Sequence, residues 1–247
     1  LDADLYENWT DVSGFLSADP RIVQNPRAIG RITFDEMREL SYMGASVLQE
    51  EAIFPVREAN IPIQIKNTNR PEDTGTVIRE TAEGDVSEHL ITGIAGKKDF
   101  LAIHVKKAHM SNEVGVISRA LNIVERYGVS VEHIPTGVDS FGIVVNASDV
   151  KDTVYSIISD IRREIEPDDI TMVDRLALVS VVGRNMSRRS GTSGKIFGAL
   201  GNAGVNIRMI TQSSEEISII VGVDNADFDR TIGVIYNGFV RDEMVSR

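Results

Sequence analysis

The chain of 247 residues contains no cysteine, which excludes disulfides, thiolate nucleophiles and cysteine-ligated metal sites. Aromatic residues make up only 6% of the sequence, and the four histidines form no His-x-x-x-His pair of the kind that binds zinc. No apolar run approaches the roughly 18 residues that span a bilayer. Acidic residues outnumber basic ones, for a net charge of −11, whereas binding to nucleic-acid phosphates needs clustered Lys and Arg. We therefore expect a cytoplasmic protein that binds neither nucleic acid nor a membrane and has no metal site of its own.

Three blocks follow one another along the chain, and we place their boundaries at 1–80, 90–174 and 175–247. In the first block, Thr33 and Glu36 have the spacing of a capping box, and the helical apolar pattern after them continues to Leu48. Alternating residues at 61–65 predict a strand. The acidic, apolar-poor stretch 79–89 is typical of a linker.

The second and third blocks are two copies of one repeat. When the sequence is shifted by 76 positions, Gly115 falls on Gly191 and Gly128 falls on Gly204, and the apolar positions 129, 131 and 134 fall on 205, 207 and 210. Duplication is the best account of several coincidences in one register.

Each copy predicts the same order of elements, a β-α-β-β-α-β unit with a ferredoxin-like sheet and helices on one face. A glycine ends the first helix of each copy, as suits the left-handed position after a helix. The predicted strands are 101–105, 129–134 and 141–145 in the first copy and 176–182, 205–210 and 217–223 in the second. The second helices are expected near 154–161 and 227–237.

The loop before the first helix of each copy is the best candidate for a binding site. Residues 189–195 look like a phosphate-binding loop, but Arg189 replaces its first glycine and Ile196 its Ser or Thr, so we interpret them as a glycine-rich helix start. In the first copy, residues 111–115 place small polar groups and a glycine where free backbone N–H groups emerge. Such a site can hold the carboxylate of an amino acid while Glu132 meets its ammonium group. Plain helix capping is the alternative.

Two aspartates and an arginine lie close together in the sequence of the first block. A turn would bring Asp11, Asp19 and Arg21 near one another. Spacing alone does not separate a nucleotide pocket from a structural ion pair, so both interpretations stay open.

Three runs of the first block resemble the C-terminal part of the catalytic domain of aspartate kinases. They are Trp-Thr-Asp-Val-Ser-Gly-Phe-Leu-Ser-Ala-Asp-Pro-Arg at 9–21, Leu-Ser-Tyr-Met-Gly-Ala-Ser-Val-Leu at 40–48 and Ala-Asn-Ile-Pro-Ile at 59–63. The two copies that follow are similar to the paired ACT regulatory domains of that family. The resemblance spans essentially the whole chain. It implies an α/β and α+β protein, in which the C-terminal part of an amino-acid-kinase α/β/α fold precedes two ferredoxin-like (βαββαβ) ACT domains.

The resemblance implies an enzyme that uses ATP and Mg²⁺ to phosphorylate the β-carboxylate of L-aspartate. This reaction is the first step to lysine, threonine and methionine. The family often has Tyr at the position of Leu16, so the contact of this chain with the nucleotide would be only apolar there. It often has Lys at the position of Ser46, so this chain lacks a positive charge at that contact. The nucleotide contacts that the resemblance implies are Thr10, Asp11, Leu16, Arg21 and Ser46.

The Lys-Phe-Gly-Gly-Thr-Ser signature of the family, with its phosphate-binding lysine, does not occur in this chain. Phosphoryl transfer depends on positioning and on charge neutralisation. We therefore expect the catalytic residues upstream of Leu1 and expect this chain alone to be inactive.

The family also implies feedback control by an amino acid, lysine or threonine, bound between ACT domains of two subunits. We accordingly expect a homodimer or a higher homo-oligomer. The second copy has Arg189 and Arg208 in place of Glu113 and Glu132, so we expect only the first copy to bind a cationic amino acid. The implied effector contacts are Met110, Glu113, Gly115, Val116, Ile117, Ser130, Val131 and Glu132. The alternative is a non-catalytic subunit that senses an amino acid, because shorter regulatory chains of the family cover the same C-terminal region.

Overall fold

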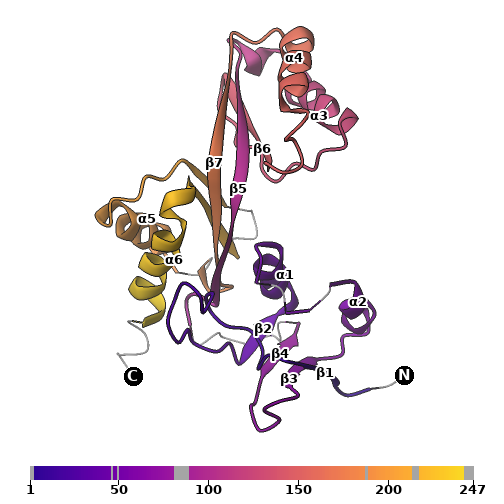
Figure 1. Cartoon of the computed structure of the whole chain (residues 1–247), viewed down its shortest axis with the longest axis vertical. Helices are drawn as coiled ribbons and strands as arrows, with labels where there is room; N and C mark the ends of the chain where they lie inside the picture. The colour runs from indigo at the N-terminus through magenta and orange to yellow at the C-terminus, as the bar shows by residue number, and fades with distance from the viewer. Residues whose placement is uncertain are drawn as a thin grey trace. The chain divides into compact units, whose positions relative to one another are not determined.

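The computed structural model describes residues 3–45, 47–48, 50–80, 89–186, 189–212 and 217–241 (Figure 1). The chain divides into two compact units, one built from 1–97 together with 178–247 and the other from 98–177. Both boundaries fall inside strands, so β5 (Gly93–Lys106) and β7 (Asp169–Val182) each contribute to both units. None of the described helices is long and apolar enough to cross a membrane.

The first sheet belongs to the amino-terminal part of the larger unit and has the strand order β1-β3-β4-β2. β1 pairs parallel with β3, β3 pairs antiparallel with β4, and β4 pairs parallel with β2. Its elements are β1 (Tyr6–Thr10), β2 (Arg31–Thr33), α1 (Phe34–Tyr42), α2 (Glu50–Glu58), β3 (Ile63–Asn67) and β4 (Thr76–Arg79).

The capping box predicted at Thr33 is confirmed, because Thr33 Oγ1 accepts from Glu36 N at 3.1 Å and Glu36 Oε2 accepts from Thr33 N at 3.0 Å. The helix ends earlier than its apolar pattern predicted. α1 stops at Tyr42, and Gly44 adopts a left-handed φ of 102° that turns the chain away. The strand predicted at 61–65 is found two residues later, since Pro62 has no N–H to give to a ladder.

The second copy of the repeat forms the rest of the larger unit. The five-stranded sheet to which it contributes has the order β6-β5-β7-β9-β8. Residues at the start of β5 are buried there, and a Cβ on Gly96 would lie 2.6 Å from Leu178 O. The other elements of this copy are α5 (Thr192–Asn202), β8 (Met209–Gln212), β9 (Ser218–Asp224) and α6 (Phe228–Tyr236).

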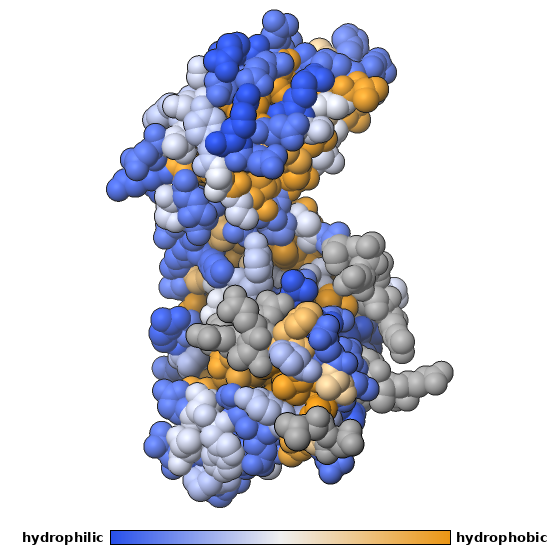
Figure 2. Space-filling model, turned by 90° about the vertical axis from the view of Figure 1, so that its right-hand side faces the viewer, coloured by the Kyte–Doolittle hydropathy of each residue, from blue (hydrophilic) through white to orange (hydrophobic). Residues whose placement is uncertain are grey.

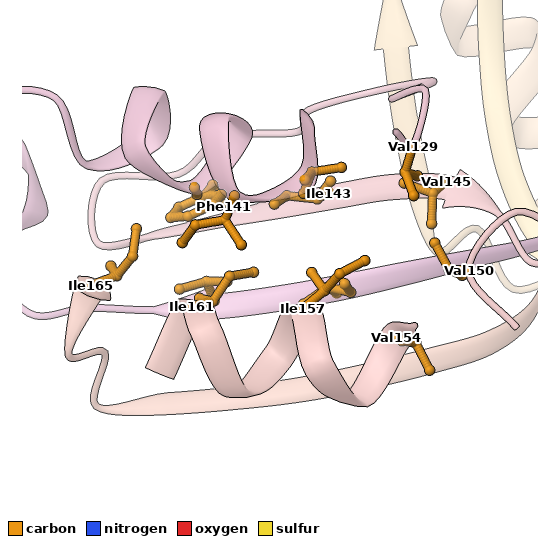
Figure 3. Close-up of a cluster of buried hydrophobic side chains, with 14 of the residues drawn as sticks. Val129, Phe141, Ile143, Val145, Val150, Val154, Ile157, Ile161 and Ile165 are labelled. Carbon is orange, nitrogen blue, oxygen red and sulfur yellow. The ribbon is translucent and has the colours of Figure 1, made fainter. Parts of the chain in front are cut away.

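The first copy forms the smaller unit around a core of buried aliphatic side chains. Its elements are a 3-10 helix η1 (Met110–Asn112), α3 (Val116–Arg126), β6 (Ser140–Asn146) and α4 (Val154–Ile165), with the adjoining parts of β5 and β7. Ile157 and Ile161 of α4 point toward Phe141 and Ile143 of β6, and all four are buried (Figure 3). The isoleucines recur at four-residue spacing, which is why one face of α4 packs on the sheet.

The backbone repeats as the sequence does. Gly115 and Gly191 precede the first helix of each copy with φ of 83° and 87°, and Gly128 and Gly204 follow it with φ of 67° and 71°. The predicted glycine after each helix is thus confirmed.

Two predicted strands differ from the structure. The strand predicted at 205–210 is found at 209–212, as β8, and the strand predicted at 129–134 is wrong. Residues 129–134 form no strand, only isolated bridges such as His133 to Val144. The N–H groups of Glu132 and His133 both point to Val144 O, at 2.8 and 3.5 Å, so two residues face one on β6. A bulge of this kind breaks the ladder that the apolar alternation predicted.

Candidate nucleotide loop and effector groove

The loop after β1 carries four of the five predicted nucleotide contacts. Thr10 is the last residue of β1 and lies in register with Asn67, the last residue of the parallel strand β3. Ligands of α/β sheets bind beyond the carboxyl ends of parallel strands. The loop from Thr10 to Arg21 therefore starts at the edge where a nucleotide is expected.

Within this loop the structure brings together only two of the three charged residues. Arg21 donates to Asp19 with Nη2 at 2.6 Å from Oδ2, and this bond holds the pKa of Asp19 below its usual range. Asp11 instead accepts from Thr10 Oγ1 at 3.2 Å. Leu16 is partly exposed and bridges Ala28 through its backbone. The remaining predicted contact, Ser46, lies outside the described residues.

A buried hydroxyl holds the loop in place. Thr76 Oγ1 accepts from Phe15 N at 2.8 Å and donates to Ile29 O at 2.6 Å. Gly14 has a φ of 100°, and a Cβ there would lie 2.3 Å from the same oxygen. Sequence reasoning missed Thr76, because its partners lie 61 and 47 residues away.

A second chain of hydrogen bonds fixes the loop from the other side. Asn67 Nδ2 donates to Ser13 Oγ at 2.8 Å, and Ser13 Oγ donates to Asp73 Oδ2 at 2.6 Å. Asn67 is buried and was also missed by sequence reasoning, although its place at the end of a strand was a usable signal. Hydrogen bonds thus fix the conformation of the loop, whereas Thr10 and Asp11 at the end of β1 stay at least partly exposed to solvent.

The predicted effector contacts divide into two groups, and the first surrounds the start of α3. Met110 and Val116 are core residues, and Ile117 packs against them, so these side chains are turned inward. Glu113 is exposed and forms ion pairs with Lys107 Nζ at 3.2 Å and with the Arg119 guanidinium. The hydrogen bond from Lys107, followed by that from Arg119, holds the pKa of Glu113 below its usual range. Two cations already neutralise this carboxylate.

The start of α3 has no side-chain cap. Its N-cap is Gly115, which makes no side-chain cap hydrogen bond. Glycine is itself a common N-cap residue, so the capping alternative stays open for this helix. An uncapped helix start can bind an anion, because its N–H groups and the helix dipole both favour negative charge.

The second group lines an open groove of about 690 Å³ beside α3. Ser130, Val131 and Glu132 line it, and so do Leu121, Asn122 and Glu125 of α3. The groove combines apolar surface with two carboxylates, those of Glu125 and Glu132, with the imidazole of His133, and with hydroxyl and amide donors.

Sequence reasoning missed Glu125, although its four-residue spacing from Leu121 places both on one face of α3. On the face that Figure 2 shows, hydrophilic residues and apolar residues both lie at the surface of the 98–177 unit. The two groove carboxylates favour a ligand that carries positive charge.

Comparisons with known proteins agree with both halves of the chain. The profile of the amino acid kinase family matches residues 1–67, and that of the ACT domain matches 179–239. A crystal structure of Clostridium acetobutylicum aspartate kinase is 52% identical, with a TM-score of 0.93, over 96% of this chain and 55% of that one. A structure of aspartokinase alpha and beta subunits is 30% identical, with a TM-score of 0.54, over 97% of that chain and 60% of this one. The chain belongs to the aspartate kinase family.

Aspartokinase 3 of Bacillus subtilis is 39% identical over all of this chain, which covers 54% of that relative. The chain thus spans about half the length of the relatives it matches. The predicted fold, part of an amino acid kinase followed by ACT domains, is confirmed by these matches.

The described part of the chain contains no group of three or more His, Cys, Asp or Glu residues that could hold a metal ion. Magnesium is usually held by one or two carboxylates together with substrate phosphates, so a magnesium site needs fewer protein ligands than such a group.

Proposed function

We propose that this chain is part of an aspartate kinase that transfers the γ-phosphoryl group of ATP to the β-carboxylate of L-aspartate. The observation that carries the proposal is the likeness to aspartate kinases along essentially the whole chain, from the loop after β1 to the last ACT repeat. Phosphoryl transfer needs little covalent chemistry from the protein, so positioning of the nucleotide is the main task of this part. The use of Mg²⁺ belongs to this proposal for the whole enzyme, and no step here depends on it.

Each residue of the loop has a defined contribution. Thr10 and Asp11 offer a hydroxyl and a carboxylate at the carboxyl end of β1 for a ribose or amino group. Leu16 supplies an apolar contact, and Ser46 is retained as a proposed contact. Arg21, with its side chain 88% exposed, is the group that can neutralise phosphate charge.

The test is steady-state kinetics of the whole enzyme with Arg21→Ala, with Arg31→Ala as the control, an exposed arginine in β2 of the same block. A charge-assisted hydrogen bond contributes about 1.5–3 kcal/mol, so the KM for ATP should rise about 10- to 100-fold while that for aspartate stays within about twofold. Equal KM values for ATP in both variants would contradict the nucleotide assignment.

We further propose that lysine is the feedback effector and that it binds at the groove. Glu125 and Glu132 would receive the two ammonium groups, and the donors of Asn122 and Ser130 would receive the carboxylate. Threonine lacks the second positive charge and gains less from two carboxylates. This choice is supported by the chemistry of the groove wall.

The groove is lined by the second group of predicted effector residues and by none of the first. A homodimer or a higher homo-oligomer solves this, because the uncapped start of α3 in one subunit can then face the groove of its partner. The oligomer therefore stays part of the proposal. Glu113 would act there as an ion-pair partner of Lys107 and Arg119 rather than as a contact of the ammonium.

Thermal unfolding of this chain with lysine, threonine, methionine, aspartate and ATP tests the site. Lysine at about 100 times its dissociation constant should add about 2.7 kcal/mol of stability. Glu132→Gln should abolish the shift, whereas Asp152→Asn, which removes an exposed charge elsewhere in the same unit, should retain it. A shift with ATP and with no amino acid would refute the groove as the effector site.

A non-catalytic regulatory subunit remains the second candidate, because the alpha and beta subunit structure matches over 60% of this chain. The amino-acid-kinase match at 1–67 favours the catalytic alternative. Strong binding of ATP to this chain, or an upstream coding segment with the missing lysine signature, would exclude the regulatory subunit.

The division into domains at 1–80, 90–174 and 175–247, and location in the cytoplasm, also belong to this proposal. The compact units group the residues differently, since 93–97 pack with the last repeat. Limited proteolysis that cuts first near residues 80–90 would support the proposed division.

A further inference from the structure

A buried carboxylate connects the amino-acid-kinase piece with the last ACT repeat. Glu36 lies in the first turn of α1 and is 1% exposed. Its Oε2 accepts from Thr33 N at 3.0 Å. Its Oε1 accepts from Thr92 Oγ1 at 2.6 Å and from Arg184 N at 3.1 Å, and Arg184 Nη1 lies 3.6 Å from Oε2. One side chain thus joins segments that are 56 and 148 residues away.

The capping box alone does not account for this arrangement. A glutamine at the third helical position completes a capping box as well as a glutamate does. Burial of a carboxylate is costly unless its lone pairs are satisfied by donors and its charge by a cation. Thr92 and Arg184 supply the donors, and Arg184 also supplies the cation. These partners outside α1 therefore explain why a charged glutamate, and not a glutamine, stands at this buried position.

Arg184 stands in a loop with a counterpart in the first repeat. It follows β7 and precedes α5, and a shift of 76 positions places the loop on residues 107–115, which carry the predicted effector contacts Met110 and Glu113. Met186 and Met110 coincide in this register, and both are buried, at 5% and 8% exposed. In the second repeat this loop contacts the kinase piece.

A second contact joins the same two parts of the larger unit. Arg27 N donates to Tyr236 Oη at 3.0 Å, and Tyr236 belongs to α6 of the last repeat. Arg27 Nη2 also donates to Ile91 O at 2.8 Å. The kinase piece is therefore attached to two elements of this repeat.

We propose that residues 183–186 of the second ACT repeat are the docking surface for helix α1 of the kinase piece, and that Glu36 is the positioning residue through which this repeat holds α1. The loop that is predicted to meet an effector in the first repeat is used in the second for a contact within the chain. The docking surface stands on the contacts alone, whereas its role in regulation rests on the proposed function.

The docking surface can be tested in this chain without any catalytic assay. Trp9 is the only tryptophan and lies in β1, so its fluorescence reports unfolding of the kinase piece. Ile196→Ala removes a buried side chain from α5 and destabilises the last repeat. In the wild-type background, Ile196→Ala should therefore lower the midpoint of the unfolding transition that Trp9 fluorescence follows. In a Glu36→Gln background, the same substitution should lower this midpoint by less than half as much.

Asp35→Asn is the matched control, because this neighbouring carboxylate is half-exposed and pairs with Arg57. It should leave the response of Trp9 to Ile196→Ala intact. If Glu36→Gln fails to fold, Arg184→Met tests the same contact from the other side. The docking surface would be overturned if Ile196→Ala lowered the Trp9 unfolding midpoint equally whether Glu36 and Arg184 are intact or one of them is replaced.

Regulation is tested in the whole enzyme with lysine as the probe. Glu36→Gln should raise the half-inhibitory lysine concentration at least fivefold, while kcat and both KM values without lysine stay within about twofold and lysine still shifts the melting temperature. Unchanged inhibition would overturn the positioning role. If lysine neither binds nor inhibits the wild type, the proposed function fails, and the Trp9 experiment still decides the docking surface.

Discussion

Replacement of Thr76 by valine is the sharpest test of how the nucleotide loop is built. Valine has nearly the shape of threonine, so the substitution removes the hydroxyl without opening a large cavity. Thr76 is 1% exposed, and its hydroxyl is bonded to Phe15 N at 2.8 Å and Ile29 O at 2.6 Å. Both partners lose a buried hydrogen bond.

The expected loss follows from these two bonds. A buried polar group left without its partner costs about 1–3 kcal/mol, so with two such groups Thr76→Val should lower the free energy of unfolding by about 2–6 kcal/mol. Thr76→Ser keeps the hydroxyl and removes one methyl group, at a cost of about 1 kcal/mol. The two variants should therefore differ by at least about 1 kcal/mol, with serine the more stable.

Urea unfolding followed by Trp9 fluorescence measures both variants, since Trp9 lies just before the loop that Thr76 holds. In the whole enzyme, Thr76→Val should also raise the KM for ATP more than that for aspartate. Equal stability of the serine and valine variants would show that the hydroxyl does not hold the loop, and would refute this reasoning.

Two further predictions concern the ACT repeats. Tyr127→Phe removes the 2.8 Å hydrogen bond that lowers the pKa of Asp160. A carboxyl group whose pKa is lowered in the folded state stabilises the fold at pH values above its pKa in the unfolded chain. That contribution is lost as the pH falls through its pKa in the folded state. The variant should therefore lose less stability than the wild type below about pH 4 in urea titrations, and a steeper loss would contradict the assignment. Gly128→Ala and Gly204→Ala should each cost about 1–2 kcal/mol in thermal unfolding, because both positions are left-handed; a neutral result at either would refute the strain argument.

Local chemistry explains which features of the fold could be predicted. The capping box depends on two residues three positions apart, and each glycine after a helix depends on the backbone of its own turn. The α4 face could be predicted because its isoleucines recur with the helical period. These signals need no knowledge of distant residues.

Long-range contacts explain what the sequence could not reveal. Nothing near Glu36 indicates that its second oxygen meets Arg184 148 residues later. The bulge opposite Val144 depends on which N–H groups the partner strand can accept, which apolar alternation does not encode. Neutralisation of Glu113 is a shorter-range case, because Lys107 and Arg119 lie only six residues away but reach it only through the turn of the loop before α3. The roles of the candidate site residues themselves stay predictions.

The larger unit is interrupted in sequence, and this has a consequence for synthesis and for truncation. Its first part, including the buried start of β5, leaves the ribosome about 80 residues before the segment from Leu178 onward that completes it. Until then, the carboxylate of Glu36 and the backbone of Arg27 lack their partners at Arg184 and Tyr236. A chain that ends before Leu178 therefore does more than lose a regulatory domain, because the kinase piece also loses the cation that pairs with Glu36 and the backbone that packs on the start of β5.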